Sequence, residues 1–196
     1  MGFHNYYRPT QIFSLAEFHD IDKHTSCAYN GIKKSWDSTK GRGHMTISFV
    51  GHSFIPQIDR IKDMVKEQIR TLIAKESSAT CYLGGHGDFD ELCACACREL
   101  KRERIDIELV YVTPYMSVSE QKKIKEMQRC GLYDASVYPP LENTPKRAAI
   151  LKRNEWMMTN ADIIIAYVNC GCGGAYRALR VAERRNKSIV NICDFI

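Results

Sequence analysis

Short apolar runs alternate with longer amphipathic stretches along most of this chain. A short run rich in β-branched and aromatic residues predicts a buried strand, whereas apolar residues recurring every three or four positions predict a helix with one buried face. The runs predict strands at 46–50, 80–83, 107–113, 133–138, 162–168 and 188–193. The amphipathic stretches predict helices at 58–73, 88–104, 119–130, 145–160 and 175–185, with Ser119 as a candidate N-terminal cap of the third.

This regular alternation indicates the fold class. Strands separated by helices are typically parallel and are joined by right-handed crossovers, with helices on both faces of the sheet. The run at 162–168 (DIIIAYV) is apolar after its first residue, as expected for a central strand covered on both sides. We therefore predict an α/β fold of three layers with a mostly parallel central sheet.

The first 44 residues lack this periodicity and are rich in His, Tyr, Asn, Ser and Lys. We predict two parts: an N-terminal extension at 1–44 that is poorly ordered or appended, and one domain at 45–196. No stretch approaches the ~18 apolar residues that span a bilayer, and the N-terminus lacks the pattern of a signal peptide. We therefore expect a cytoplasmic protein that does not interact with membranes.

Charge and cysteine content exclude other classes. A formal charge of +5 over 196 residues is a mild excess, so nucleic acid is not an expected partner. The nine cysteines are an odd number without a secretory signal, which argues against a disulfide framework. Cys170 and Cys172 have no second pair at zinc-site spacing. We expect small buried thiols, no metal site and no bound cofactor.

Three predicted strands are followed by glycine-rich loops: Gly51-His52-Ser53, Gly84-Gly85-His86-Gly87-Asp88 and Gly171-Cys172-Gly173-Gly174. Glycine allows the backbone to approach a ligand closely, and the start of the following helix offers free N–H groups to an anion. In a parallel sheet the carboxyl ends of the strands share one edge, where ligands bind. The loops therefore predict a pocket for a phosphorylated group, although neither the dinucleotide nor the P-loop glycine motif is present.

Three segments together resemble a known family: FVGHS at 49–53, YLGGHGDFDELCA at 82–94 and LKRNEWMMTNADIIIAYVNCGCGGAYRALRVAERR at 151–185. In order and spacing they are similar to the SLOG superfamily, which includes the LOG-type nucleoside-monophosphate phosphoribohydrolases and the Smf/DprA DNA-processing proteins. The match is closest to its bacterial YpsA-like branch. The resemblance implies a Rossmann-like fold, a pocket for a nucleotide or nucleotide-derived ligand, a phosphate-facing Arg153 and, by analogy, a homodimer.

The loop before the last helix departs from the LOG enzymes. It reads GCGGAYRA, so that Tyr176 occupies the threonine position and Ala178 the position of the catalytic glutamate. Without that carboxylate, glycosidic cleavage lacks its acid/base group. The favoured function is therefore binding or sensing of a nucleotide derivative. One alternative is a phosphoribohydrolase or deoxyribosyltransferase-like enzyme using Asp90 or Glu91, and a second is DprA-like binding of single-stranded DNA.

Candidate ligand contacts lie in the glycine loops and on three of the predicted helices: Gly51, His52, Ser53, Gly84, Gly85, Asp88, Asp90, Arg153, Asn154, Gly171, Gly173, Gly174 and Tyr176. Several have an alternative structural explanation. His52 would bond to local backbone, and Asp88 would cap a helix. Arg153 would belong to a solvated basic stripe, Asn154 would be a surface amide, and Tyr176 would only pack against neighbouring side chains.

Overall fold

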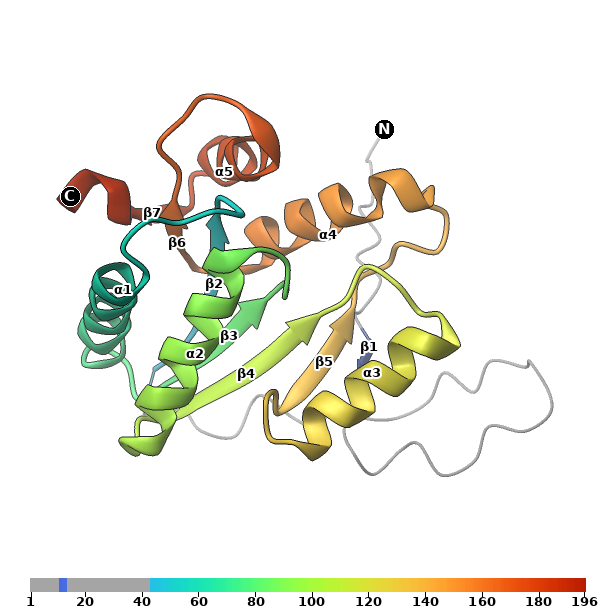
Figure 1. Cartoon of the computed structure of the whole chain (residues 1–196), viewed down its shortest axis with the longest axis horizontal. Coiled ribbons are helices and arrows are strands. Elements are labelled where there is room, and N and C mark those ends of the chain that lie inside the picture. The colour runs from blue at the N-terminus through green and yellow to red at the C-terminus, as the bar shows by residue number, and fades with distance from the viewer. Residues whose placement is uncertain (1–10, 14–42) are drawn as a thin grey trace, which may run out of the picture.

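A computed structural model of the chain describes residues 11–13 and 43–196 (Figure 1). In chain order its elements are β1 (Gln11–Phe13), β2 (His44–Gly51), α1 (Ile58–Ile73), β3 (Ser78–Leu83), α2 (Asp88–Arg102), β4 (Ile107–Val112), α3 (Val118–Arg129), β5 (Ala135–Tyr138), α4 (Lys146–Asn160), β6 (Ile163–Tyr167), α5 (Gly173–Arg184), β7 (Ser188–Asn191) and the 3-10 helix η2 (Ile192–Phe195). All six strands and five helices predicted from the pattern are present.

The strands form one sheet in the order β1-β5-β4-β3-β2-β6-β7. Strands β2 to β7 are parallel, and β1 pairs antiparallel with β5. The chain moves outward from β2 through β3 and β4 to β5, and then returns along α4 to place β6 on the other side of β2. The point at which strand order reverses therefore lies between β2 and β6, which is where open α/β sheets bind ligands.

Apolar cores cover both faces of the sheet. Alternate residues of β6 face opposite sides: Ile165 belongs to the core beneath α1 and α2, whereas Ile164 and Ala166 belong to the core beneath α4 and α5. Both sets are fully buried, which explains why this strand is apolar at successive positions. The predicted α/β class, Rossmann-like with three layers and a mostly parallel sheet, is confirmed.

A charged cluster joins α1 to α2 outside their apolar contact. The Glu99 carboxylate of α2 lies 2.8 Å from Lys66 Nζ and 3.1 Å from Lys62 Nζ of α1. The hydrogen bonds from Lys66 and then Lys62 lower the pKa of Glu99 to about 2. This carboxylate is therefore charged throughout the physiological range, and the cluster fixes how α1 and α2 lie against each other.

Some predicted boundaries are wrong by a few residues. The cap of α3 is Ser117, whose Oγ accepts the N–H of Glu120, whereas Ser119 lies in the first helical turn. Helix α5 begins at Gly173, two residues before the predicted start, and the last strand ends at Asn191 because 192–195 form η2.

The predicted extension at 1–44 falls mostly outside the described residues. Its described part includes β1, which adds an antiparallel strand to the edge of the sheet, and His44, which opens β2. The boundary at residue 45 and the predicted disorder of 1–44 stay predictions.

Candidate functional site

A cleft of about 310 Å³ lies at the point of strand reversal between β2 and β6. Its walls come from the end of β2, the loop before α2, the middle of α4 and the start of α5. The lining residues are Phe49, Val50, Gly51, His52, Ser53, His86, Asp90, Ile150, Arg153, Asn154, Met157, Met158, Gly173, Gly174 and Ala175. The lining combines apolar side chains with ring, amide, carboxylate and guanidinium groups. Such a mixture suits a ligand with both an apolar ring and polar substituents.

His52 fixes the mouth of this cleft between β2 and β6. Its backbone N–H donates to Tyr167 O at 3.3 Å, and its Nε2 accepts the N–H of Asn169 at 3.2 Å. The two interpretations of His52 are therefore compatible, because the ring bonds to nearby backbone and also lines the cleft. Since a backbone N–H can only donate, Nε2 carries a lone pair, and the ring proton of the neutral imidazole is on Nδ1.

The first turn of α5 faces the same cleft. Gly173 has φ +85°, a backbone conformation that side chains with a Cβ rarely adopt, and Gly174 and Ala175 follow it along the wall. The preceding residue, Cys172, is extended and makes no side-chain capping hydrogen bond among the described residues. The first N–H groups of a helix have no intrahelical partner, and they lie at the positive end of the helix dipole. This turn therefore presents donors suited to an anion.

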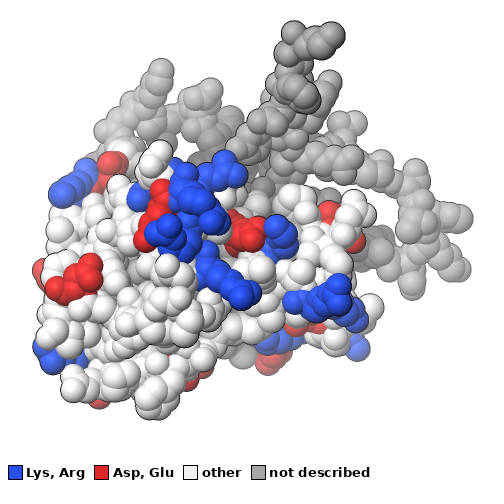
Figure 2. Space-filling view, turned by 90° about the horizontal axis from the view of Figure 1, so that it is seen from above, with Lys and Arg blue, Asp and Glu red and all other residues white. Residues whose placement is uncertain are grey.

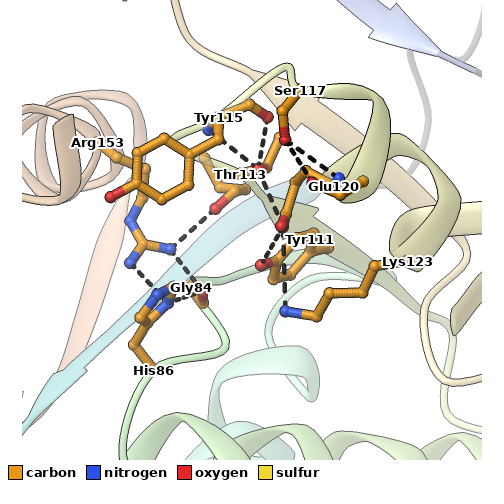
Figure 3. Close-up of polar contacts among 11 residues, drawn as sticks. Gly84, His86, Tyr111, Thr113, Tyr115, Ser117, Glu120, Lys123 and Arg153 are labelled. Atoms are coloured by element: carbon orange, nitrogen blue, oxygen red, sulfur yellow. Dashed lines mark hydrogen bonds and ion pairs between the residues drawn. The ribbon is translucent and has the colours of Figure 1, made fainter. Parts of the chain in front are cut away.

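Arg153 is 1% exposed and ties α4 to the ends of two strands (Figure 3). Its Nη1 donates to Gly84 O at 2.6 Å and to Val112 O at 2.8 Å. Its Nε has no hydrogen-bond partner in the described part of the chain. The interpretation of Arg153 as part of a solvated stripe is therefore wrong. Burial lowers its pKa and nearby Asp90 raises it, but a guanidinium stays protonated in proteins.

His86 was not singled out from the sequence, although it lies inside the second glycine loop and lines the cleft. Its Nδ1 is 2.9 Å from Gly84 O and 3.4 Å from Nη2 of Arg153. Both of these contacts cannot form at once, because the carbonyl requires a protonated Nδ1 and the guanidinium requires a lone pair. The shorter contact with the carbonyl is the stronger, so the proton lies on Nδ1. Among the described residues, the contact of Arg153 Nη2 with His86 is then a weak one.

Asp90 is the carboxylate of this cleft. One of its oxygens accepts the N–H of His86 at 2.9 Å. Burial raises the pKa of Asp90, while the His86 N–H and the charge of Arg153 oppose that rise. A carboxyl group shifted in this way is suited to general acid/base chemistry.

The second glycine loop divides between two clefts. Gly85, Asp88 and Glu91 line a separate cleft of about 370 Å³ together with Tyr111 and Tyr133. Gly85 has φ +66°, and a Cβ there would lie 2.7 Å from the Tyr111 ring. The expected convergence of the three loops is therefore partial: the first and third share the β2–β6 cleft, and the second contributes only His86 and Asp90 to it.

The other predicted contacts lie as follows. Gly84 binds Arg153 through its carbonyl oxygen, and Ser53 and Asn154 line the β2–β6 cleft. The capping role of Asp88 is wrong, because the N-cap residue is Gly87 and has no side-chain cap. Exposed Gly171 and half-buried Tyr176 line neither of these two clefts, and Tyr176 packs against the core under α5.

Exposed basic residues follow the two helices beside the β2–β6 cleft: Lys146, Arg147 and Lys152 on α4, and Arg177, Arg180, Arg184 and Arg185 on or just after α5. Figure 2 shows Lys and Arg side chains gathered in the middle of the face seen from above, with acidic side chains between them. The mild overall charge of the chain therefore conceals a local basic excess.

The cysteines only partly follow the expectation of buried thiols. Cys81, Cys93 and Cys97 are buried, but Cys130, Cys170 and Cys172 are exposed. Among residues 11–13 and 43–196, no three His, Cys, Asp or Glu side chains are arranged to hold a metal ion, and no helix is long and apolar enough to cross a membrane.

The fold and the position of this cleft define an open α/β domain that would take its ligand at the reversal of strand order. Comparisons with protein-family models and with curated proteins gave no match. Solved structures with a similar fold include DNA processing protein A (DprA) from Streptococcus pneumoniae, with a TM-score of 0.53 at 12% identity over 74% of this chain and 49% of that one. Another is the DprA of Helicobacter pylori, with a TM-score of 0.51 at 15% identity over 82% of this chain and 77% of that one.

These similarities concern the fold. The chain spans about half the length of the S. pneumoniae protein, and identity to both is low. The Smf/DprA proteins are among those that the sequence segments resemble, so sequence and structure agree at the level of the fold. The H. pylori structure is described as showing a single-stranded DNA binding mode of that protein.

Proposed function

We propose that this protein binds a nucleotide or a nucleotide-derived phosphorylated small molecule in the β2–β6 cleft. One observation carries the proposal: the uncapped first turn of α5 and the buried Arg153, whose Nε is unpartnered among the described residues, line the same cleft. A buried donor without a partner is costly, and an anion oxygen or an ordered water would remove that cost. The phosphate would lie against Gly173 and Gly174, and the base against apolar lining side chains such as Met157.

We also propose a family for this protein. The three sequence segments and the DprA-like fold support membership of the SLOG superfamily, and the segments favour its YpsA-like branch. A homodimer is expected by analogy with that superfamily, and size-exclusion chromatography with light scattering would measure it.

Binding is tested with a nucleoside monophosphate and the matching nucleoside, using calorimetry. Since the phosphate supplies the contact with α5, the nucleoside should bind at least about tenfold more weakly, which corresponds to about 1.4 kcal/mol. Gly174→Asp places a carboxylate in the cleft and should abolish binding. Gly171→Asp is the matched control, because this exposed glycine lies outside the lining and a Cβ added to it would meet no described atom within 4 Å. Equal loss in both variants, or binding unaffected by Gly174→Asp, would exclude this site.

Single-stranded DNA is the second candidate ligand. The basic residues of α4 and α5 beside the cleft, and the DNA-binding mode named for the H. pylori protein, favour it. An oligonucleotide that tracks these residues would bind with an affinity that falls steeply with salt. If oligonucleotide binding survives Gly174→Asp but falls on replacing Arg177 and Arg180 together, the basic face rather than the cleft is the functional surface.

Hydrolysis of the nucleotide is a further candidate because Asp90 lies in the cleft. Release of free base from a nucleoside monophosphate would establish it, provided that Asp90→Asn abolishes the release. Glu91→Gln is the natural control, since Glu91 lines the neighbouring cleft and should leave the rate unchanged.

A further inference from the structure

Two exposed cysteines lie side by side in the loop before α5. The Sγ atoms of Cys170 and Cys172 are 3.6 Å apart, and Cys170 Sγ is also 3.6 Å from His52 Nε2. Two thiols at this separation need to approach by only about 1.5 Å to reach the ~2.05 Å of a disulfide. The loop therefore holds a dithiol close to the geometry of its oxidised form.

His52 is placed to accept a proton from Cys170. The single lone pair of Nε2 faces both the N–H of Asn169 at 3.2 Å and Cys170 Sγ at 3.6 Å, so taking the thiol proton requires the Asn169 hydrogen bond to open. The hydrogen bond with Cys170, and the negative charge that Cys170 carries when ionised, raise the pKa of Cys172. Cys170 is the thiol that contacts this proton acceptor, and a thiolate is the reactive form of a cysteine.

The remaining described cysteines do not share this environment. Cys81, Cys93 and Cys97 are buried, and burial is the largest cause raising the pKa of Cys93. Two more are half-buried: Cys95, whose Sγ lies 3.5 Å from a Glu99 carboxylate oxygen, and Cys193, whose pKa burial raises. Cys130 is exposed, but its Sγ lies 3.4 Å from a Glu126 carboxylate oxygen, whose hydrogen bond raises the pKa of the thiol. Neighbouring negative charge disfavours a thiolate there. Exposure, a close second thiol and a proton acceptor come together at the Cys170–Cys172 pair.

We propose that Cys170 and Cys172 form a reversible oxidation site in which His52 takes the first proton. The Cys170 thiol proton moves to His52 Nε2, and the thiolate attacks a low-molecular-weight disulfide. The S–S bond of that disulfide breaks, one thiol leaves with a proton, and Cys170 holds the other half as a mixed disulfide. Cys172, deprotonated in turn, attacks Cys170 Sγ and releases the second thiol. Two protein thiols lose two electrons and two protons, and the small disulfide gains both.

An exposed disulfide between such close positions would be easily reduced again, as labile, regulatory disulfides are. Its formation would act on the β2–β6 cleft, since Cys172 precedes Gly173 at the start of α5 and Cys170 would move away from His52. This consequence rests on the proposed function. We expect the oxidised protein to bind a nucleoside monophosphate about tenfold more weakly.

The oxidation site is tested on the full chain with glutathione disulfide, alkylation of the remaining thiols and intact mass spectrometry. On oxidation the wild type should lose two alkylatable thiols more than the Cys170→Ser/Cys172→Ser double variant loses. Its mass should fall by about 2 Da with no glutathione retained, and dithiothreitol should restore both thiols. Cys172→Ser should retain one glutathione on Cys170. An equal loss of thiols on oxidation in wild type and double variant, or glutathione that stays on Cys170 in the wild type, would overturn the proposal.

The role of His52 is measured from the pH dependence of Cys170 alkylation in the Cys172→Ser background. With His52 present, Cys170 should be alkylated several-fold faster at and below neutral pH than in His52→Gln, because glutamine cannot take the thiol proton. Glutamine retains an acceptor for the Asn169 N–H, so a purely structural role would leave the two profiles the same, and identical profiles would refute the proton transfer. Because thiol counts need no nucleotide, oxidation without any nucleotide binding would reject the proposed function alone.

Discussion

Replacing Arg153 with Met tests whether a buried cation holds the sheet edge together. Methionine fills the volume of the arginine stem but removes the hydrogen bonds of Nη1 to Gly84 O and Val112 O. A hydrogen bond to a charged group contributes about 1.5–3 kcal/mol, and removing the charge returns part of the desolvation cost of the guanidinium. In the variant, Gly84 O still accepts a hydrogen bond from His86 Nδ1, whereas Val112 O loses the hydrogen bond from Arg153. We expect a net loss of about 2–4 kcal/mol.

Urea unfolding followed by circular dichroism measures this loss, and for a protein of this size it corresponds to a fall of roughly 5–15 °C in Tm. Arg147→Met is the matched control on the same helix, since Arg147 is exposed and its replacement should change stability by less than about 0.5 kcal/mol. Asp90 should couple to Arg153: in an Asp90→Asn background the loss should shrink by about 1 kcal/mol, because no unpaired carboxylate is left behind. A loss below about 1 kcal/mol would show that desolvation of the guanidinium cancels its hydrogen bonds, and would refute the reasoning.

Three other changes have expected outcomes. Because burial raises the pKa of Asp90, its protonated form is the more stable one, so wild type should lose stability relative to Asp90→Asn as pH rises from about 4 through the raised pKa; a difference that instead grows towards acid pH would contradict this. The pKa of Glu99 is lowered to about 2, so the stability that Glu99 contributes is complete above about pH 4.5 and is lost towards pH 2. Measured by urea unfolding, Glu99→Gln should therefore cost about 1 kcal/mol at pH 7, since the cluster is partly exposed, and almost nothing at pH 2. Gly85→Ala should cost about 1–3 kcal/mol more than Gly131→Ala, because both glycines have φ near +66° but only a Cβ at Gly85 would meet the Tyr111 ring; equal losses by chemical denaturation would show that the ring moves aside freely.

Hydrophobic periodicity predicted the sheet and its layers because burial on one or both faces dictates residue type at successive positions. The run at 163–167 shows this most clearly, since its central residues alternate between two cores and are all apolar. The site was less predictable. Arginine is a residue type usually found on the surface, so the identity of Arg153 does not indicate burial. Only its spacing from Ala149 and Met157, four residues away on either side, places it on the buried stripe of α4.

The acidic residues after the second glycine loop line two different clefts, and the spacing of these residues on a helix could have predicted this. Asp88 and Glu91 are three residues apart and share a face of α2, whereas Asp90 points about 200° away from Asp88. The three acids are neighbours in the sequence, but the helix sends them to different clefts. The Cys170–His52 contact had no such signal, because it joins loops that are 118 residues apart and come together only after the chain has crossed the sheet.

That separation has a consequence for how the molecule would respond to a ligand. The β2–β6 cleft is completed by α5, and its lining residue His52 is held by Asn169, which follows β6. The first strand of the parallel sheet and one of the last two must therefore be paired before an anion can be held. A ligand that binds only this closed arrangement would stabilise it by about 2.7 kcal/mol at a hundredfold excess over its Kd. Protection of the β6 amides from hydrogen exchange would then rise with ligand concentration. The exchange rate of this strand would therefore report the fraction of protein that has ligand bound.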